Sequence, residues 1–123
     1  MIMDKTILIA EDIDSNYLLV KAILGKSYNL IRALNGEEAV ELYKQHKPDM
    51  IFMDIKMPKM SGVEATQKIR EISKEVPIVA LTAYAYDSDR DLALEVGCND
   101  FITKPLDRMN LIEIAKKYTS LDD

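Results

Sequence analysis

The chain has 123 residues, of which 48% are apolar and 30% are charged, and its formal net charge is −5. This length suits one domain and is too short for two, and the composition is that of a folded globular protein. The negative charge argues against a nucleic-acid surface as the main function, and no apolar run is long enough to span a membrane. A single cysteine excludes an intramolecular disulfide and suits a reducing compartment.

Five short apolar segments alternate along the chain with five segments of helical periodicity. The apolar segments predict strands at 5–10, 28–33, 49–54, 77–82 and 100–104. Three of them are almost unbroken runs of apolar residues, which is typical of strands buried on both faces. The helical periodicity covers 15–26, 35–47, 61–73, 88–96 and 107–119.

Capping residues mark the start of most of these helical segments. Asn35 and Ser61 are each followed three residues later by a glutamate, which is the pattern of a capping box. Asp87 and Asp107 are the expected caps of the last two helices.

Five consecutive strand–helix units predict an α/β fold with a single five-stranded parallel sheet and helices on both faces. The expected strand order is the flavodoxin-like 2-1-3-4-5. In such folds ligands bind at the carboxyl ends of the strands where the strand order reverses, here between the first and third strands. No linker or repeat interrupts the chain, so residues 1–123 are expected to form one domain.

Polar side chains stand at the predicted carboxyl ends of the strands. They are Glu11 and Asp12 after the first strand, Asp54 on the third, Thr82 on the fourth and Lys104 on the fifth. Neighbouring strands lie about 5 Å apart, so three carboxylates converge, and they cannot all stay ionised without a cation. Such oxygen ligands suit Mg²⁺, an ammonium suits a phosphoryl oxygen, and an aspartate can act as the nucleophile. The set therefore predicts phosphoryl transfer.

These residues lie in four short segments, "AED", "MDIKMP", "ALTA" and "TKPL". In this order and on these strand ends they resemble the receiver domains of response regulators in two-component signalling, over essentially the whole chain. The longer strings "DIKMPKMSGVEATQKIRE" and "PIVALTAYAYDSDRD" most resemble receivers of hybrid histidine kinases, and a stand-alone single-domain response regulator is the alternative. The resemblance also implies a cis peptide bond between Lys104 and Pro105.

The resemblance implies a role for each polar residue at the site. Asp54 would accept a phosphoryl group from a phosphohistidine, and Lys104 would pair first with that carboxylate and then with the phosphate. Mg²⁺ or Mn²⁺ would be held by Glu11, Asp12, Asp54 and the backbone carbonyl of Lys56. Glu11 stands where aspartate is commoner in the family, and the sequence leaves open whether it reaches the metal directly or through water.

A conformational switch is implied as well. Thr82 would donate a hydrogen bond to the phosphate, and Phe101 would swing inward, changing the face formed by the fourth and fifth strands and the last two helices. Lys56 and Tyr84 stand at positions that tune the lifetime of the phosphate in this family.

The implied partner is a histidine kinase or a histidine phosphotransfer domain, with no direct contact to nucleic acid or membrane. The implied location is the cytoplasm, which includes the cytoplasmic part of a membrane-bound kinase. The domain would catalyse its own phosphorylation and dephosphorylation without being a turnover enzyme.

Three other functions share part of this pattern. A phosphotransferase of the haloacid-dehalogenase kind also uses a strand-end aspartate with Mg²⁺, but it needs a second aspartate two residues on, where this chain has Lys56. A flavodoxin-like ligand-binding module would need a phosphate loop rich in glycine and hydroxyls after the first strand, where this chain has acids. A receiver that acts through contacts alone has the least support, because all five site positions carry the residues needed for phosphorylation.

Overall fold

The computed structural model describes residues 5–83 and 88–119. The strands are β1 (Thr6–Ala10), β2 (Asn29–Ala33), β3 (Met50–Asp54), β4 (Ile78–Thr82) and β5 (Asp100–Thr103). The helices are α1 (Asp14–Leu24), α2 (Gly36–His46), α3 (Gly62–Ile72), α4 (Ser88–Val96) and α5 (Arg108–Thr119). Within the described ranges, no helix combines the length and the apolar character that crossing a membrane requires.

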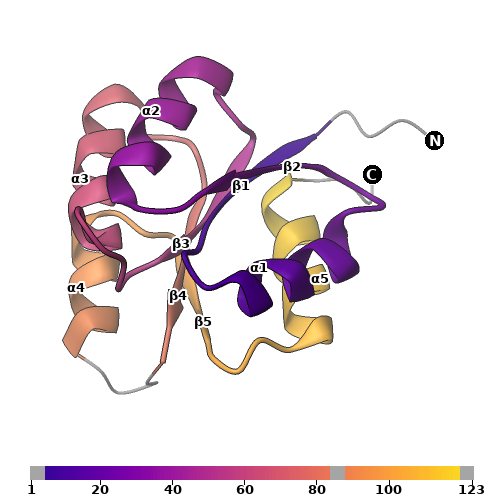
Figure 1. The fold of residues 1–123 in the computed structure, drawn as a ribbon. Coiled ribbons are helices and arrows are strands. Elements are labelled where there is room, and N and C mark those ends of the chain that lie inside the picture. Colours follow the sequence, from indigo (N-terminus) through magenta and orange to yellow (C-terminus); the bar gives the residue numbers. More distant parts are fainter. Residues whose placement is uncertain (1–4, 84–87, 120–123) are drawn as a thin grey trace.

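The five strands form one parallel sheet in the order β2-β1-β3-β4-β5 (Figure 1). This confirms the predicted α/β fold and its strand order. Because β1 lies between β2 and β3, the chain reverses its direction of travel across the sheet after β2. The carboxyl ends of β1 and β3 therefore meet at the point where a ligand is expected.

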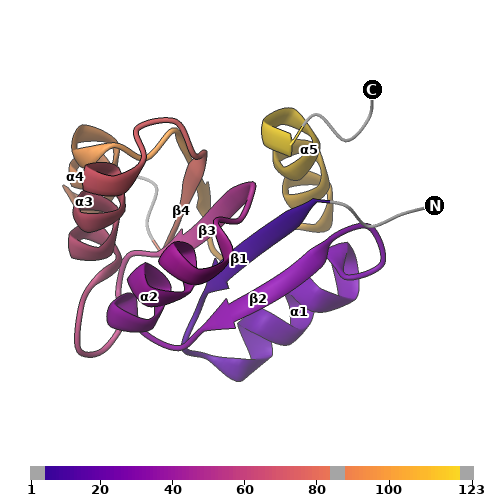
Figure 2. The ribbon, with the colours of Figure 1, turned by 90° about the horizontal axis from the view of Figure 1, so that it is seen from above.

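The sheet is covered on both faces, with α1 and α5 on one side and α2, α3 and α4 on the other (Figures 1 and 2). Each face has its own cluster of buried side chains, one built with the first pair of helices and one with the other three. Every residue of β3 and β4 is buried, as the unbroken apolar runs predict. This double burial gives a rigid support for the groups at the strand ends.

Most helices begin as the capping residues predict. The side chains of Asn35 and Ser61 accept hydrogen bonds from the backbone N–H three residues on, at 2.8 and 3.2 Å. Asp107 accepts the equivalent bond at 3.0 Å, and all three predictions are confirmed. Asp87 lies outside the described residues. Helix α1 differs, because its N-cap residue is Ile13 and makes no side-chain capping bond.

Candidate functional site

The polar residues singled out at the strand ends lie together at one edge of the sheet. Glu11 directly follows β1, Asp54 and Thr82 are the last residues of β3 and β4, and Lys104 directly follows β5. Glu11 is fully buried, while Asp54 and Thr82 are only 4% and 1% exposed. Buried ionisable groups are costly unless they are paired, so their contacts define what the site can do.

Lys104 connects two of the carboxylates. Its ammonium donates a hydrogen bond to Asp54 Oδ2 at 3.0 Å and lies 3.1 Å from Glu11 Oε1. Burial acts to lower the pKa of Lys104, but Asp54 and Glu11 outweigh this effect and raise the pKa above its usual value. Lys104 therefore carries its positive charge at neutral pH.

Glu11, Asp12 and Asp54 form a cluster of acids. One oxygen of each lies within 4.8 Å of an oxygen of the others. The pKa of Glu11 is raised, first by burial and then by the charge of Asp54, and Lys104 only partly offsets this. The free energy of the site therefore rises when all three acids are ionised, unless a further cation joins them.

Two oxygens of this cluster have unused acceptor capacity. Glu11 Oε1 and Asp12 Oδ1 are buried, and neither has a hydrogen-bond partner among the described residues. The ammonium of Lys104 lies at ion-pair distance from Glu11 Oε1 without meeting hydrogen-bond geometry. Hard anionic oxygens with unused acceptor capacity are the donors that Mg²⁺ and Mn²⁺ prefer, so these residues fit a divalent cation.

The other carboxylate oxygens are held by the local backbone. Glu11 Oε2 accepts a hydrogen bond from the N–H of Ile13 at 3.2 Å. Asp54 Oδ1 accepts one from the N–H of Lys56 at 3.1 Å. Each side chain is thus fixed by one oxygen while its second oxygen faces the site.

A cavity of about 150 Å³ opens above Asp54. It is lined by Ile13, Asp54, Ile55, Lys56, Thr82, Ala83 and Lys104. The cavity therefore presents a carboxylate, a hydroxyl residue and an ammonium to anything that enters it. This combination suits a small group that carries negatively charged oxygens.

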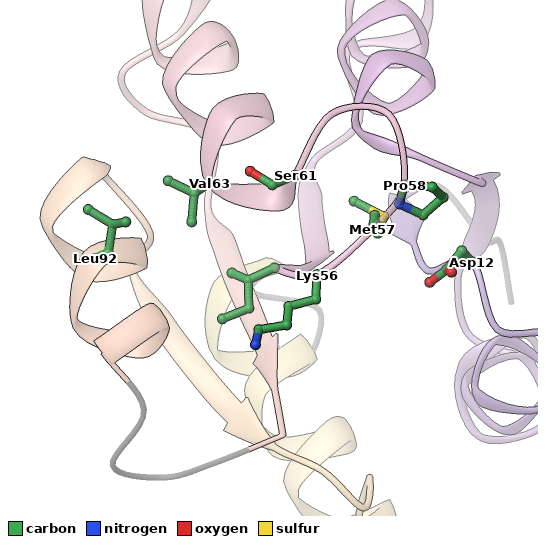
Figure 3. A pocket seen from close by; sticks show the side chains of 8 residues that line it. Asp12, Lys56, Met57, Pro58, Ser61, Val63 and Leu92 are labelled. Atoms are coloured by element: carbon green, nitrogen blue, oxygen red, sulfur yellow. The ribbon is translucent and has the colours of Figure 1, made fainter.

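A larger groove of about 650 Å³ adjoins this cavity. It runs from Asp12 past the loop after β3 to Leu92 on α4, and the side chain of Lys56 lies between the two ends (Figure 3). Lys56 and Ile55 line both spaces. Lys56 therefore lies at the junction of the cavity and the groove.

Phe101 and Thr82 lie on neighbouring strands, with Phe101 paired opposite Ala80. The Phe101 ring is partly buried against the cluster under α2, α3 and α4. The guanidinium carbon of Arg90, on α4, lies 5.0 Å from the centre of this ring. The aromatic residue therefore contacts the helix that follows the Thr82 strand.

The two remaining predictions concern the segments after β4 and β5. The peptide bond between Lys104 and Pro105 is cis in the structure. Tyr84 lies outside the described residues.

The sequence reasoning did not identify two arginines near the site, Arg32 and Arg90. Arg32, on β2, donates a hydrogen bond from Nε to the carbonyl oxygen of Glu11 at 3.1 Å. A signal for it was present, because Arg32 is the one charged residue of the strand segment 28–33. Arg90 gave no such signal, because a charged residue on a polar helix usually faces solvent.

The sequence matches the family model described as "Response regulator receiver domain" over residues 7–116. It is 36% identical over 119 residues to the polar-differentiation response regulator DivK of Brucella anthropi, which covers 94% of this chain and 97% of that protein.

Two solved structures show the same architecture. One is the receiver domain of the sensor histidine kinase PA1611 from Pseudomonas aeruginosa, with a magnesium ion in its active-site cleft. It has a TM-score of 0.88 and 34% identity, over 94% of this chain and 98% of that chain. The other is the receiver domain of Ssk1 from Saccharomyces cerevisiae, solved with the histidine phosphotransfer protein Ypd1. It has a TM-score of 0.89 and 32% identity, over 99% of this chain and 93% of that chain.

Proposed function

The chain belongs to the response regulator receiver family, and we propose that Asp54 accepts a phosphoryl group from a phosphohistidine of a partner protein. The main observation behind the proposal is the buried Asp54 carboxylate, which accepts a hydrogen bond from the Lys104 ammonium at 3.0 Å, and both residues line a small cavity. One oxygen of Asp54 bonds to phosphorus as the phosphorus–nitrogen bond breaks. The electron pair of that bond returns to the imidazole of the donor.

The same proposal includes a divalent cation, Mg²⁺ or Mn²⁺, held by Glu11, Asp12, Asp54 and the backbone carbonyl of Lys56. Three carboxylates and one ammonium leave two negative charges in excess, which a divalent cation balances. The buried oxygens of Glu11 and Asp12 that have no hydrogen-bond partner among the described residues support the assignment. When bound, the cation supplies neutralisation of charge on the phosphoryl oxygens.

Lys104 and Thr82 hold the phosphoryl group after transfer. Because the pKa of Lys104 is raised, its ammonium stays charged and can exchange its contact with Asp54 for one with a phosphoryl oxygen. Thr82 ends β4 and lines the cavity, so its hydroxyl can donate to a second oxygen. Both groups would therefore contact the phosphoryl oxygens once the group is on Asp54.

The switch couples this hydrogen bond to the surface beside α4. Movement of Thr82 toward the phosphate shifts the end of β4, which pairs with β5 from Val79 to Thr82. Phe101 responds by leaving its contact with Arg90 and turning inward. The phosphate adds about −1.5 to −2 charges, enough to bias such a two-state element.

The donor histidine must reach Asp54 through the mouth of the cavity, which suits a histidine kinase or a histidine phosphotransfer domain. Ile13 forms part of this mouth and is 50% exposed, and Leu18 on α1 is 57% exposed. We place the contact with the partner on these apolar side chains. The exchange belongs in the cytoplasm, where a buried thiol such as Cys98 stays reduced. The relatives include a protein named as a response regulator and a receiver domain of a sensor kinase. The proposed role of Asp54 does not depend on which of these two settings applies.

Labelling of the intact protein tests the proposal. A small phosphodonor with Mg²⁺ should add the mass of one phosphoryl group to the wild-type chain and none to Asp54→Asn. Asp49→Asn is the matched control, because Asp49 lies just before the opposite end of β3 and should be labelled normally. Equal labelling of Asp54→Asn would overturn the assignment.

Two further arms separate the alternatives. Chelation of the metal should abolish labelling, and Mn²⁺ should restore it. Sustained turnover of a generic phosphoester would instead indicate a phosphotransferase of the haloacid-dehalogenase kind. In the labelled protein the ring resonances of Phe101 should shift, and this shift should be lost in Thr82→Ala even where labelling persists.

A further inference from the structure

A charged side chain of β2 reaches the acidic turn that follows β1. Arg32 pairs in register with Ile9, two residues before Glu11. Its guanidinium reaches along the strand direction, and Nε donates a hydrogen bond to the carbonyl oxygen of Glu11 at 3.1 Å. The side chain of Arg32 is only 21% exposed, so this bond is shielded from water.

The same guanidinium contacts two further residues of the segment. Nη2 lies 2.8 Å from Asp14 Oδ1, and the guanidinium carbon lies 4.8 Å from the centre of the Tyr17 ring. The side chain of Asp14 is 82% exposed, so solvent screens the ion pair. The bond to the Glu11 carbonyl and the contact with the Tyr17 ring are therefore the main contacts through which Arg32 holds the segment.

Among the described residues, the acidic turn has two other polar contacts from outside itself. The Lys104 ammonium lies 3.1 Å from Glu11 Oε1. The N–H of Glu11 donates to Ala33 O at 3.0 Å, which ties the first residue of the turn to β2. Helix α1 follows, and its N-cap residue Ile13 makes no side-chain capping bond. The Glu11 carbonyl belongs to the planar peptide group that joins Glu11 to Asp12. A bond that fixes this oxygen therefore fixes the plane between the two acids.

We propose that Arg32 is a positioning residue of the acidic site: by holding the Glu11 carbonyl it pre-orients the carboxylates of Glu11 and Asp12 toward Asp54 for a divalent cation. This inference rests on the proposed function in one respect, namely that the site takes Mg²⁺. Partners that orient metal ligands typically change metal affinity by about 10–100-fold when they are removed.

The sign of the effect separates positioning from simple electrostatics. Arg32→Met removes a positive charge close to the acids, and this change alone would strengthen the attraction of a cation. Loss of positioning predicts the opposite, a weaker affinity for Mg²⁺. Arg32→Lys keeps the charge but lacks the planar fork, so it should lie between wild type and Arg32→Met.

Titration of the metal-free proteins with Mg²⁺, followed through backbone amide NMR resonances, tests the inference. We expect the dissociation constant to rise about tenfold in Arg32→Met, to rise less in Arg32→Lys, and to stay within about twofold in Asp14→Asn. Amide hydrogen exchange of Asp12 and Ile13 in the absence of metal should be faster in Arg32→Met, while the amides of β3 and β4 keep their protection. Thermal unfolding establishes that each variant is folded. If Arg32→Met does not fold, the comparison of Arg32→Lys with wild type tests the inference.

An affinity in Arg32→Met that equals or exceeds that of wild type would overturn the inference, and so would unchanged exchange at the acidic turn. Failure of the wild-type chain itself to bind Mg²⁺ would overturn the proposed metal site and this inference together. Normal binding by wild type with no effect of Arg32 would overturn the inference alone. The two failures are therefore distinguishable.

Discussion

The two edges of the sheet differ in how completely their polar and charged groups are paired. At the edge formed by the amino ends of the strands, a charged donor is paired with neutral hydrogen-bond acceptors. Arg70 donates to Gly97 O at 2.8 and 3.0 Å, to Ser73 O at 3.1 Å and to Asn99 Oδ1 at 3.0 Å. Asn99 Oδ1 also accepts the N–H of Ile78 at 2.8 Å.

At the edge formed by the carboxyl ends, like charges are gathered. Glu11, Asp12 and Asp54 share one site with the single ammonium of Lys104, and two buried oxygens of the acids have no hydrogen-bond partner among the described residues. The comparison indicates that the contacts at the amino edge stabilise the folded protein. The clustered acids at the carboxyl edge destabilise it in the absence of a ligand, which is typical of a functional site.

The largest effect is expected at the amino edge. Arg70→Met removes the four hydrogen bonds that the guanidinium donates, including both of its bonds to the Gly97 carbonyl. We expect the free energy of unfolding to fall by about 3 kcal/mol. A single bond to a charged group contributes roughly 1.5–3 kcal/mol, but the four bonds share one guanidinium whose burial is itself unfavourable, so their contributions do not add. Urea unfolding measures the loss, and Mg²⁺-dependent labelling of the folded variant should be unchanged.

Lys68→Met is the matched control for this prediction. Lys68 lies on the same helix, is exposed, and forms no ion pair with another described residue. It should change the free energy of unfolding by less than about 0.5 kcal/mol. A strong effect of Arg70→Met on labelling, in protein that is still folded, would show that the two edges are coupled.

At the carboxyl edge, unlike the amino edge, the effect of a substitution on the free energy of unfolding should depend on Mg²⁺. Lys104→Met leaves Asp54 and Glu11 without their cation, so the metal-free protein should lose about 2 kcal/mol of unfolding free energy. Saturating Mg²⁺ should recover part of this loss, because the metal neutralises the same carboxylates. Thermal unfolding with and without Mg²⁺ measures both terms.

Lys117→Met serves as the control, because Lys117 is 63% exposed and lies 3.7 Å from the carboxylate of Asp100. It should have little effect, and that effect should not depend on Mg²⁺. The expectation for Lys104 fails if its variant is equally destabilised at all Mg²⁺ concentrations.

The fold was predictable from the sequence because each strand is short, apolar and separated from the next by a helix with a recognisable start. The strand order was expected because 2-1-3-4-5 is the common order for five parallel strands with helices on both faces. The grouping of Glu11, Asp54, Thr82 and Lys104 at one edge was predictable for the same reason, since parallel strands place their carboxyl ends together.

The side-chain contacts around the site were not predictable in this way. The bond from Arg32 to the Glu11 carbonyl depends on the reach of a long side chain across two strands. The contact between Arg90 and the Phe101 ring depends on the rotation of α4 over β5. Neither the periodicity of the strand nor that of the helix contains this information. The raised pKa of Glu11 likewise depends on how deeply the turn is buried, which the sequence did not show.

The smallest effect has the opposite sign, because neutralising a member of the acidic cluster should stabilise the metal-free protein. Burial and Asp54 raise the pKa of Glu11 above its ordinary value of 4.5, so the folded state holds this proton more tightly than the unfolded state. The favourable contribution of the protonated form is complete below pH 4.5 and is lost as the pH rises through the raised pKa. At neutral pH the ionised carboxylate therefore costs stability.

Glu11→Gln should remove this cost. In the absence of metal we expect it to raise the free energy of unfolding at neutral pH by roughly 0.5–2 kcal/mol, and the difference from wild type should shrink as the pH falls toward 4.5. Glu113→Gln, on the exposed face of α5, should show no such pH dependence. Saturating Mg²⁺ should favour wild type, since the proposed metal site includes the carboxylate that glutamine lacks. A metal-free Glu11→Gln protein that is less stable than wild type at neutral pH would mean that the carboxyl edge is paired as well as the amino edge.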